Sequence, residues 1–481
     1  MDDRELRKKT IGGLAWKFAE RFAAQGISFI VSLVLARILM PEEYGIVALV
    51  TVIISLCDVF VNSGLGTALI QKKDADELDY STVFFFSFAM ALVLYLVLFL
   101  MSPFIANYYQ KESLICILRV MGLRMIIASL NTVQHAYVSS TMQFKKFFFS
   151  TLVGTIGSAV VGIALAVSGM GVWALIGQYM FNSVIDTIVL FFTIQWKPKL
   201  MYSWERWKQL FAYGWKLLVS SFIDTLYNNL RSLIIGKKYS SEDLAYYNKG
   251  KQFPELINSN ILSSIENVLF PAIALKQDNK ETVKSMVRRF IKTSSFILGP
   301  LMIGMAAVAE PMVKLLLTDK WIFCVPYIQI YCFVGFLQPI QTANQQAIKA
   351  LGRSDITLKL EIVKKVFGVV LLISVMQFGV FAIAASNMVY SVIVLIINSY
   401  PNRKLLNYSI FEQLKDFAPN FMTALVMGIV VYAMTYLSLP TIVVLALQVI
   451  VGVLLYLVIS KVTKNESLEY LMTIGLDCFR K

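Results

Sequence analysis

Long apolar segments alternate with short polar ones along almost the whole chain. A bilayer crossing needs about 20 apolar residues, and on that scale the pattern predicts about fourteen membrane-spanning helices. The predicted spans lie near residues 11–39, 45–70, 81–106, 114–141, 147–168, 171–194, 209–236, 247–272, 291–316, 326–350, 359–378, 380–400, 414–437 and 440–460. Because no polar stretch between them is long enough for a separate globular domain, we expect an all-α integral membrane protein.

Lysine and arginine residues are distributed unequally between alternate connections of these spans. The N-terminus, the even-numbered connections and the C-terminal tail, with their flanks, hold 30 of them, whereas the opposite set holds 9. Positive charge is retained on the cytoplasmic side of a membrane. The pattern therefore predicts that both termini lie in the cytoplasm. The first apolar segment has no small-residue cleavage site, so we expect it to be a retained span.

The chain also contains an internal repeat of about two hundred residues. The sequence GVWALI at 171–176 matches GVFAIA at 379–384, which lies 208 positions further on. Parallel repeats related by an axis along the membrane normal are typical of transporters that alternate access between the two sides. We expect two six-helix lobes, followed by two extra helices and a cytoplasmic tail, in residues 1–200, 201–405 and 406–481.

Composition and charge exclude several other classes of protein. The chain is 57% hydrophobic and only 15% charged, whereas about a quarter of the residues in a soluble domain are charged. Its net charge of +14 is scattered between apolar segments, which indicates contact with membrane lipids and no nucleic-acid partner. The short connections contain no catalytic motif, metal-ligand cluster or phosphate-binding glycine loop. We therefore expect no enzyme activity, resident metal or cofactor.

Polar side chains share single faces of the first and seventh predicted spans, which are equivalent in the repeat. In the first span this face carries Lys17, Arg21, Gln25, Ser28 and Ser32, and in the seventh it carries Lys216, Ser220, Asp224, Asn228 and Arg231. A cation or Asp at the centre of a span costs about 3 kcal/mol. We expect the two faces to line opposite walls of one basic, water-filled cavity between the lobes.

Several residues in the spans have two open interpretations. Arg124 and Arg231 are candidates for binding an anion, because a guanidinium at that depth must meet an anion or water. Asp58 and Asp224 are candidate counter-ions to these arginines or a site for a coupling cation. His135 is either a hydrogen-bonded core residue or a proton relay. The neutral polar residues are expected to join helices to one another, and Lys17 and Lys216 could instead extend to the membrane interface.

A basic cavity is suited to one class of substrate. A guanidinium pairs bidentately with phosphate or carboxylate oxygens, so arginines on both walls fit an anionic head group. Removing each methylene of a lipid tail from the bilayer costs about 0.8 kcal/mol, so a lipid-linked substrate would keep its tail in the membrane while its head crosses. The residues therefore indicate transport of an anionic, lipid-linked molecule.

Six segments together resemble a known family. They are KKTIGGLAW at 8–16, LARILMPEEYGIVAL at 35–49, SGLGTALIQKKD at 63–74, NVLFPAIALKQD at 267–278, LLLTDKW at 315–321 and LGRSDITLKLE at 351–361. In order and spacing the chain resembles the Wzx-type polysaccharide repeat-unit flippases of the multidrug/oligosaccharidyl-lipid/polysaccharide exporter (MOP) superfamily, in the branch of colanic-acid and teichuronic-acid exporters. The resemblance covers most of the chain.

The resemblance implies a two-lobed flippase that moves an undecaprenyl-diphosphate-linked oligosaccharide outward across the bacterial cytoplasmic membrane, for lipopolysaccharide or exopolysaccharide synthesis. By helix and face, the positions that fit the diphosphate-binding cations of the family are Arg21, Arg37, Lys216 and Arg231. The resemblance also implies coupling to a Na⁺ or H⁺ gradient and cooperation with polysaccharide polymerase machinery. The alternative is a cation-coupled multidrug antiporter of the same superfamily, for which we would expect about twelve helices and an acidic cavity.

Overall fold

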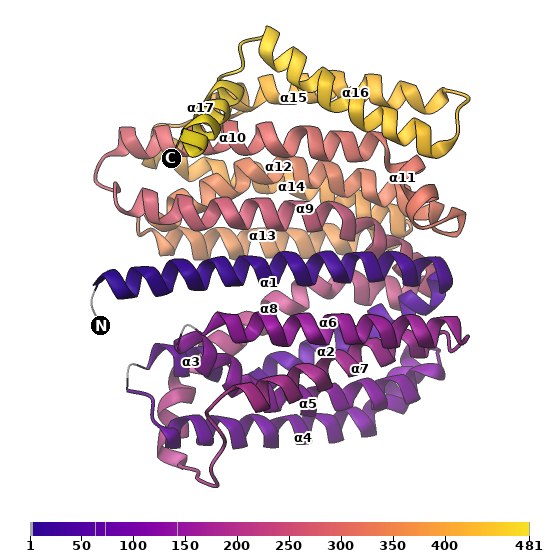
Figure 1. The fold of residues 1–481 in the computed structure, drawn as a ribbon, viewed down its shortest axis with the longest axis vertical. Coiled ribbons are helices and arrows are strands. Elements are labelled where there is room, and N and C mark those ends of the chain that lie inside the picture. Colours follow the sequence, from indigo (N-terminus) through magenta and orange to yellow (C-terminus); the bar gives the residue numbers. More distant parts are fainter. Residues whose placement is uncertain (1–2, 63, 73, 142, 481) are drawn as a thin grey trace. The chain divides into compact units, whose positions relative to one another are not determined.

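The computed structural model describes residues 3–62, 64–72, 74–141 and 143–480 (Figure 1). In this part of the chain the fold is all-helical, with seventeen α-helices and two short 3-10 helices. Eleven of its helices are long and apolar enough to cross a membrane. The chain is thus a multi-pass membrane protein.

Contacts divide the chain into a first unit, Met1–Ala245, and a second unit, Tyr246–Lys481. The predicted boundary between lobes, at residues 200 and 201, precedes helix α8, Trp204–Lys238, in the sequence, whereas the boundary between the two units follows it. Within the first unit, α8 packs on the helix formed by Pro41–Asn62. The predicted lobes 1–200 and 201–405, with the appended segment 406–481, therefore stay a prediction.

The first unit is a bundle of eight helices and the start of a ninth. They are α1 Asp3–Ile38, α2 Pro41–Asn62, α3 Leu65–Gln71, α4 Glu77–Tyr109, α5 Ser113–Ser140, α6 Phe144–Val167, α7 Val172–Thr193, α8 and α9 Ser241–Ala274. Helix α6 packs between α1 and α7, and α5 packs on α4, α2 and α7. A buried apolar cluster that includes Leu65, Val83, Val133 and Leu190 joins α3, α4, α5 and α7.

The second unit contains the remaining helices. They are α10 Lys280–Ala307, α11 Ala309–Leu316, η1 Asp319–Cys324, α12 Val325–Ala350, α13 Ser354–Val375, α14 Val380–Leu405, α15 Ile410–Ala433, η2 Met434–Tyr436, α16 Thr441–Val462 and α17 Glu466–Arg480. Helix α12 packs on α10 and α14, while α15 packs on α10 and carries α16. The aromatic ring of Phe296 on α10 lies 5.1 Å from that of Tyr456 on α16, measured between ring centroids.

The helix order and packing of the two units follow the internal repeat. Gly171 and Gly379 precede α7 and α14, and both have positive φ angles, +56° and +100°. A glycine adopts this left-handed region without the steric cost that a side chain would add. In the first unit α5 packs on α4 and α7, and in the second unit α12 packs on α10 and α14. The matching strings 208 positions apart therefore start equivalent helices.

Each of the fourteen predicted spans overlaps a helix of at least 22 residues. Eleven of these helices have the apolar composition of a membrane span, and the other three are α8, α9 and α13. Helix α8 is less apolar than a typical membrane span because it carries charged residues such as Lys216, Asp224 and Arg231. Eleven of the fourteen predicted spans are thus supported by the structure, and the other three stay predictions.

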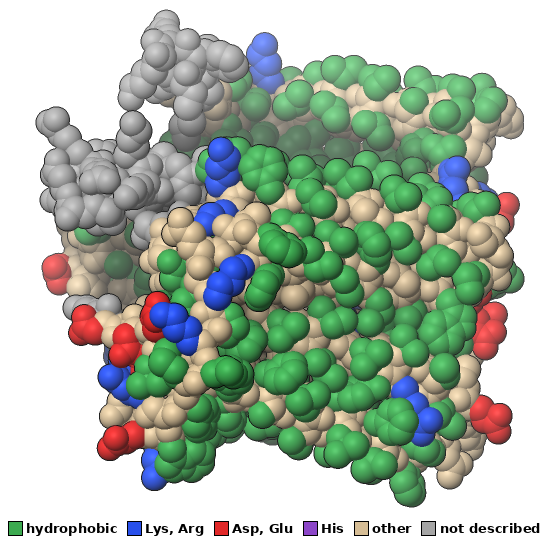
Figure 2. All heavy atoms as spheres, turned by 60° about the horizontal axis from the view of Figure 1, so that its bottom comes forward, with side chains coloured by type: hydrophobic (Ala, Val, Ile, Leu, Met, Phe, Trp, Pro, Cys, Tyr) green, Lys and Arg blue, Asp and Glu red, His purple; other side chains and the backbone are tan. Residues whose placement is uncertain are grey.

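The outer surface fits a lipid environment. In Figure 2 hydrophobic side chains cover a broad band of the visible face, and charged side chains gather toward its two ends. On α4 the exposed side chains include Leu92, Val93, Leu96, Val97 and Leu100. Exposed leucine and valine side chains at successive turns of one helix would aggregate in water, so this surface is suited to contact with lipid tails.

Candidate functional site

The first unit contains a cavity of about 800 Å³, and most of its lining residues have polar side chains. Helices α2, α3, α5, α7 and α8 supply its lining. Among the described residues that line it, four have acidic or basic side chains: Asp58, Arg124, His135 and Asp186. Such groups are rare within membrane-spanning helices, and where they occur they usually mark a transport pathway.

Helical periodicity brings these residues together. On α2 the cavity is lined by Ser55, Asp58 and Asn62, which are three and four residues apart. On α5 it is lined by Arg124 and His135, which are eleven residues, or about three turns, apart. Residues at these spacings share one face of a helix. The residues of α2 and α5 that line the cavity thus each come from one face of their helix.

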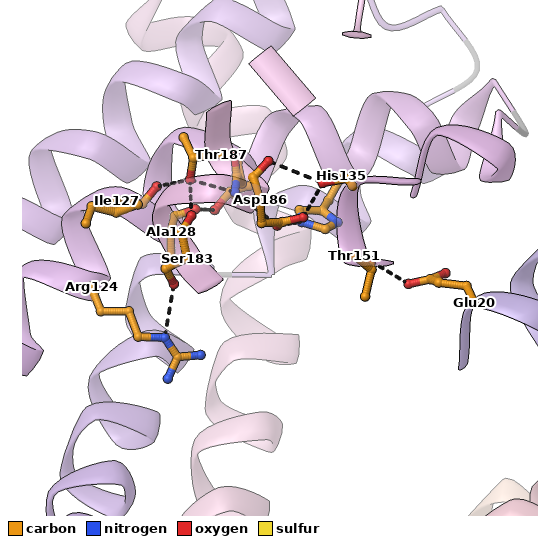
Figure 3. Close-up of polar contacts among 12 residues, drawn as sticks. Glu20, Arg124, Ile127, Ala128, His135, Thr151, Ser183, Asp186 and Thr187 are labelled. Atoms are coloured by element: carbon orange, nitrogen blue, oxygen red, sulfur yellow. Dashed lines mark hydrogen bonds and ion pairs between the residues drawn. The ribbon is translucent and has the colours of Figure 1, made fainter. Parts of the chain in front are cut away.

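Arg124 is held by its Nε atom, which donates a hydrogen bond to Ser183 Oγ at 3.2 Å (Figure 3). Its guanidinium carbon lies 5.9 Å from the centroid of the Tyr179 ring, and the carboxylate of Asp58 lies close enough to attract it. Within the described part of the chain its two terminal nitrogens make no hydrogen bond or ion pair. Because a guanidinium offers five N–H donors, Arg124 retains donors for an anion.

Asp186 on α7 is the centre of a polar network that sequence reasoning missed (Figure 3). Its carboxylate accepts hydrogen bonds from Ser150 Oγ on α6 and from Asn131 Nδ2 on α5, the second at 3.3 Å. His135 Nε2 lies 3.7 Å from the same carboxylate. The signal in the sequence was an aspartate inside an apolar span, which is the same signal that singled out Asp58.

His135 packs like a core residue on one side of its ring, but it is not fully buried. Its ring stacks on Phe147, with the two centroids 4.9 Å apart, but about half of its side chain is exposed to the cavity or solvent. A histidine ring close to a carboxylate can pass a proton to it. The relay interpretation therefore stays open.

The other predicted site residues do not line this cavity. Arg21 is half-buried on α1, and Arg37 is exposed near the end of that helix. On α8, Lys216 and Asp224 are exposed, whereas Arg231 is buried. The side chain of Lys17 lies outside the described residues.

Helix α8 presents a different face to the cavity. Its lining residues are Leu217, Leu218, Ser221 and Thr225. The stripe that begins at Lys216 is offset from the Leu217 stripe by one residue, or about 100° around the helix. The cavity of the first unit thus joins Arg124 and Asp58 but excludes the predicted face of α8. The role predicted for that face, as one wall of a basic cavity between two lobes, stays a prediction.

The electrostatic character of this cavity is mixed. Its described lining has one arginine and one histidine against two aspartates. Asp186 already accepts two hydrogen bonds, while Arg124 and Asp58 lie near each other without a direct ion pair. The cavity can therefore offer Arg124 to an anion or the carboxylates to a cation.

Residues 34–326 match the family model described as "Polysaccharide biosynthesis protein". The chain belongs to this family. As a Wzx-like member of this family, it is a membrane transporter and not an enzyme. The resemblance seen in the sequence segments is confirmed.

Three similar members of the polysaccharide biosynthesis family are bacterial. Lipopolysaccharide biosynthesis protein WzxC of Escherichia coli is 25% identical over 367 residues, which cover 75% of this chain and 73% of that protein. Teichuronic acid biosynthesis protein TuaB of Bacillus subtilis is 24% identical over 411 residues, covering 83% and 84%. Succinoglycan biosynthesis transport protein ExoT of Rhizobium meliloti is 23% identical over 336 residues, covering 70% and 68%.

The fold of this family member is also found in solved structures. Lipid II flippase MurJ in an inward closed conformation superposes with a TM-score of 0.76 at 14% identity, covering 94% of this chain and 98% of that one. An inward-facing multidrug resistance MATE family transporter of the MOP superfamily gives a TM-score of 0.61, also at 14% identity, covering 80% and 96%. The chain thus has the fold shared by these two transporters.

Proposed function

We propose that this protein flips an undecaprenyl-diphosphate-linked oligosaccharide across the bacterial cytoplasmic membrane by alternating access. The observation that carries the proposal is the polar cavity of about 800 Å³ inside a bundle of apolar helices, with Arg124 on its wall. Family membership and the names of the three relatives support a role in building a surface polysaccharide. Polysaccharide polymerase machinery would receive the flipped unit.

We further propose fourteen spans with both termini in the cytoplasm, in two lobes that rock about the substrate. The diphosphate would be bound by cations on several helices: Arg21, Arg37, Arg124, Lys216 and Arg231. Arg124 is the member of this set with geometric support, because it lines a cavity and its terminal nitrogens make no hydrogen bond or ion pair to the described residues. A doubly charged phosphate head would gain charge-assisted hydrogen bonds there.

The experiment measures translocation of a fluorescent undecaprenyl-diphosphate oligosaccharide in proteoliposomes, scored by the accessibility of the sugar to an external reagent. We expect the wild-type protein to translocate it and Arg124→Ala to be slower by about tenfold or more, because a hydrogen bond to a charged group contributes roughly 1.5–3 kcal/mol. Absence of translocation by folded wild-type protein, with several glycans tried, would overturn the function.

Arg119→Ala is the matched control. Arg119 lies on the same helix, but its Nε donates to Ser102 Oγ at 3.0 Å and its guanidinium carbon lies 4.0 Å from the Phe99 ring centroid, away from the cavity. We expect this variant to retain the wild-type rate. Equal rates for Arg119→Ala and Arg124→Ala would remove the binding role of Arg124 while leaving the flippase in place.

We propose that Asp58 or Asp224 carries the coupling to a Na⁺ or H⁺ gradient. The asparagine variant of the coupling residue should lose the response to an imposed gradient but keep exchange of substrate, because the amide cannot change its charge. Asp278→Asn, at an exposed position between α9 and α10, is the control and should respond as the wild type does. An unchanged gradient response in both Asp58→Asn and Asp224→Asn would exclude this role.

One observation favours the alternative function, a cation-coupled multidrug antiporter. The cavity of the first unit has two aspartates against one arginine, and carboxylates can hold an organic cation. Efflux of a cationic dye from cells that express the protein tests this alternative. Dye efflux that depends on Asp58 and Asp186, without oligosaccharide translocation, would favour the antiporter.

A further inference from the structure

The second unit contains a separate polar pocket of about 310 Å³, between α9, α12, α13 and α14. Among its described lining residues, only Leu262 and Val394 have fully apolar side chains. The rest carry hydroxyl, amide, carboxylate or ammonium groups. Polar groups at such density inside a membrane bundle must be satisfied by one another, by water or by a ligand.

Helix α12 provides the floor of this pocket through one face. Gln338, Gln341, Thr342 and Gln345 are spaced by three, one and three residues, and all four line the pocket. Residues at i, i+3, i+4 and i+7 lie on the same side of a helix. Neutral polar residues of the spans were expected to join helices to one another, and the pocket gives the glutamines of this face a second use.

Two of the glutamines are fixed by the protein. Gln341 donates its amide protons to the Ser391 carbonyl at 2.8 Å and to Ser391 Oγ at 2.9 Å. Gln345 Nε2 donates to Glu361 Oε1 at 2.8 Å. These bonds orient the two side chains, and within the described part of the chain their Oε1 atoms accept no hydrogen bond. Each amide therefore presents a fixed acceptor.

Other lining groups keep hydrogen-bonding capacity as well. Gln338, Thr342, Glu266 and Asn398 make no side-chain hydrogen bond to the described residues. Gln338 and Asn398 each offer an amide donor and an acceptor, Thr342 a hydroxyl, and Glu266 two carboxylate oxygens. The pocket thus combines donors and acceptors around a small volume.

The charge of this pocket does not suit a phosphate. Its one lysine, Lys364, is buried and lies 2.5 Å from Glu361 Oε1, so its charge is already paired. Glu266 adds a negative charge that repels an anion. The pocket also contains no arginine among its described lining residues. This pocket is therefore not suited to bind a phosphate, in contrast with the cavity that contains Arg124.

Hydroxyl groups are the chemistry that fits. A sugar hydroxyl donates one hydrogen bond and accepts others, so a pyranose ring can use amide oxygens, amide N–H groups and a carboxylate at the same time. The volume lies at the small end of the range for ligand pockets and suits a single ring more than an oligosaccharide. Leu262 and Val394 offer too little apolar wall for a lipid tail.

We propose that this pocket is a subsite for one neutral sugar ring of the transported glycan. The inference rests on the proposed function, since the ring would belong to the lipid-linked oligosaccharide. It assigns sugar recognition to the amide and carboxylate groups of the second unit, separate from the anion-binding role of Arg124. The proposal depends most on Gln338 and Glu266, because neither side chain makes a hydrogen bond or ion pair to the described residues.

The test is saturation-transfer difference NMR on the full-length protein in nanodiscs, with glucose, galactose and N-acetylglucosamine as probes and the open-chain polyol sorbitol as reference. We expect at least one of the ring sugars to give a signal above that of sorbitol. Gln338→Met and Glu266→Gln should each reduce this signal by about fivefold, since each removes hydrogen-bonding groups at nearly constant volume. Two variants are used so that misfolding of one does not decide the outcome.

Two control variants separate the subsite from other causes. Gln329→Met lies on the same helix outside the pocket, where Gln329 Nε2 donates to the Ala306 carbonyl at 3.3 Å, and it should retain the signal. Gln377→Met, at an exposed position between α13 and α14, should also retain it. No ring sugar above sorbitol, or an unchanged signal in both pocket variants, would overturn the subsite.

Failure of the subsite is distinguishable from failure of the proposed function. Translocation by the wild-type protein without sugar binding in this assay would remove the subsite and leave the flippase. Sugar binding that depends on Gln338 and Glu266, without translocation of any lipid-linked oligosaccharide, would overturn the flippase and leave a sugar-binding pocket that does not belong to a transported glycan.

Discussion

Asp186 shows how one side chain can connect three helices of the first unit. It lies on α7 and contacts Ser150 on α6 together with Asn131 and His135 on α5. Asn131 Nδ2 also donates to Thr187 Oγ1 at 2.9 Å, so the amide bridges two residues of α7. Asp186 therefore joins α5, α6 and α7 through its hydrogen bonds, whereas Asp58 lies near Arg124 and has fewer fixed partners.

Gly45 on α2 makes the closest backbone approach among the described glycines. A Cβ atom at this position would lie 1.8 Å from the carbonyl oxygen of Ser241, the first residue of α9. We predict that Gly45→Ala destabilises the protein by about 1–3 kcal/mol, because the backbone of Ser241 must move away. Thermal unfolding of the purified protein in detergent measures this change.

Gly66→Ala is the control for this prediction. A Cβ atom at Gly66, on α3, would meet no atom closer than Thr132 Cγ2 at 3.9 Å, which is an ordinary contact. This variant should unfold at the wild-type temperature or slightly above it, since alanine favours a helix over glycine. Identical unfolding temperatures for Gly45→Ala and Gly66→Ala would refute the steric argument.

At the scale of elements, α4 begins with a reciprocal cap. Asp76 Oδ1 accepts from the backbone N–H of Asp79 at 2.9 Å, and the backbone N–H of Asp76 donates to Asp79 Oδ2 at 3.2 Å. This backbone hydrogen bond, with Arg206 and Lys72 nearby, holds the pKa of Asp76 below its ordinary value. The carboxylate form of Asp76 therefore stabilises the start of α4.

The cap predicts a pH dependence. A carboxyl group with a lowered pKa in the folded protein contributes stability above its unfolded pKa of about 3.9, and this contribution is lost as the pH falls through the lower folded pKa. We predict that Asp76→Ala costs about 1 kcal/mol at neutral pH. The difference from the wild type should shrink below about pH 4, as measured by unfolding temperatures at several pH values.

Asp74→Ala serves as the comparison, because Asp74 is exposed two positions before the cap and outside α4. Its removal should change the unfolding temperature little at any pH. A loss of stability in Asp76→Ala that is the same at pH 3 and pH 7 would show that the charged cap is not its cause.

A second element-scale feature is the buried amide network that joins α12, α14 and α15. Asn344 Nδ2 donates to Gln413 Oε1 at 2.7 Å, and Asn402 Nδ2 donates to Asn344 Oδ1 at 2.6 Å. All three side chains are fully buried. We predict that Asn344→Leu costs about 2 kcal/mol, because it removes the side-chain hydrogen bonds to both partner amides in a dry environment. Gln413 would keep its bonds to Ser399 Oγ and the Tyr408 carbonyl, and Asn402 its bond to the backbone carbonyl of residue 344.

Thermal unfolding in detergent measures this cost as well. The control is Gln377→Leu, since Gln377 is an exposed amide in the turn between α13 and α14. It should change the unfolding temperature by much less than Asn344→Leu. Comparable shifts in the two variants would mean that burial of the network contributes nothing.

The sequence predicts helices better than it predicts their ends and their partners. Apolar runs located the long helices because the bilayer sets their length. The predicted span 45–70 merged α2 with α3, although Gly64 between them has a φ of +67° that interrupts a helix. Helix α17 was not predicted, because Glu466–Arg480 is too polar for a span.

The candidate site was predictable only along single helices. The sequence singled out Arg124 and Asp58 because each is a charged residue inside a predicted span, where a charge is costly. Which helices meet is decided by packing, so the sequence did not indicate that Asp186 joins Asn131 and Ser150. The glutamine pocket was missed for the same reason, since its walls come from four helices.

At the scale of the whole molecule, the number of spans depends on α8, α9 and α13. These helices are long enough to cross the bilayer, but they are less apolar than the other eleven. A charged residue near the centre of a span costs about 3 kcal/mol when it faces lipid, so such a helix inserts only when neighbouring helices or water cover its polar face. In the first unit α8 packs on α2, α3 and α4, which covers part of its surface.

The predicted topology can be tested across α9. Alkaline phosphatase is active only outside the cytoplasm, and green fluorescent protein inserted at the same sites reports the opposite side. We expect phosphatase activity when the reporter is inserted after Ser240, which precedes α9, and none when it is inserted after Asp278, which follows it. The reason is the charge asymmetry, since the connection after α9 and its flank belong to the set with 30 cations.

Insertion after Lys111 gives the reference, because α4 and α5 on either side of it are both apolar enough to span the membrane. This site should be active and should match the site after Ser240. If the sites after Ser240 and Asp278 reported the same side, α9 would not cross the bilayer. An odd number of crossings would then place the two termini on opposite sides, and the positive charges would no longer account for the orientation of the second unit.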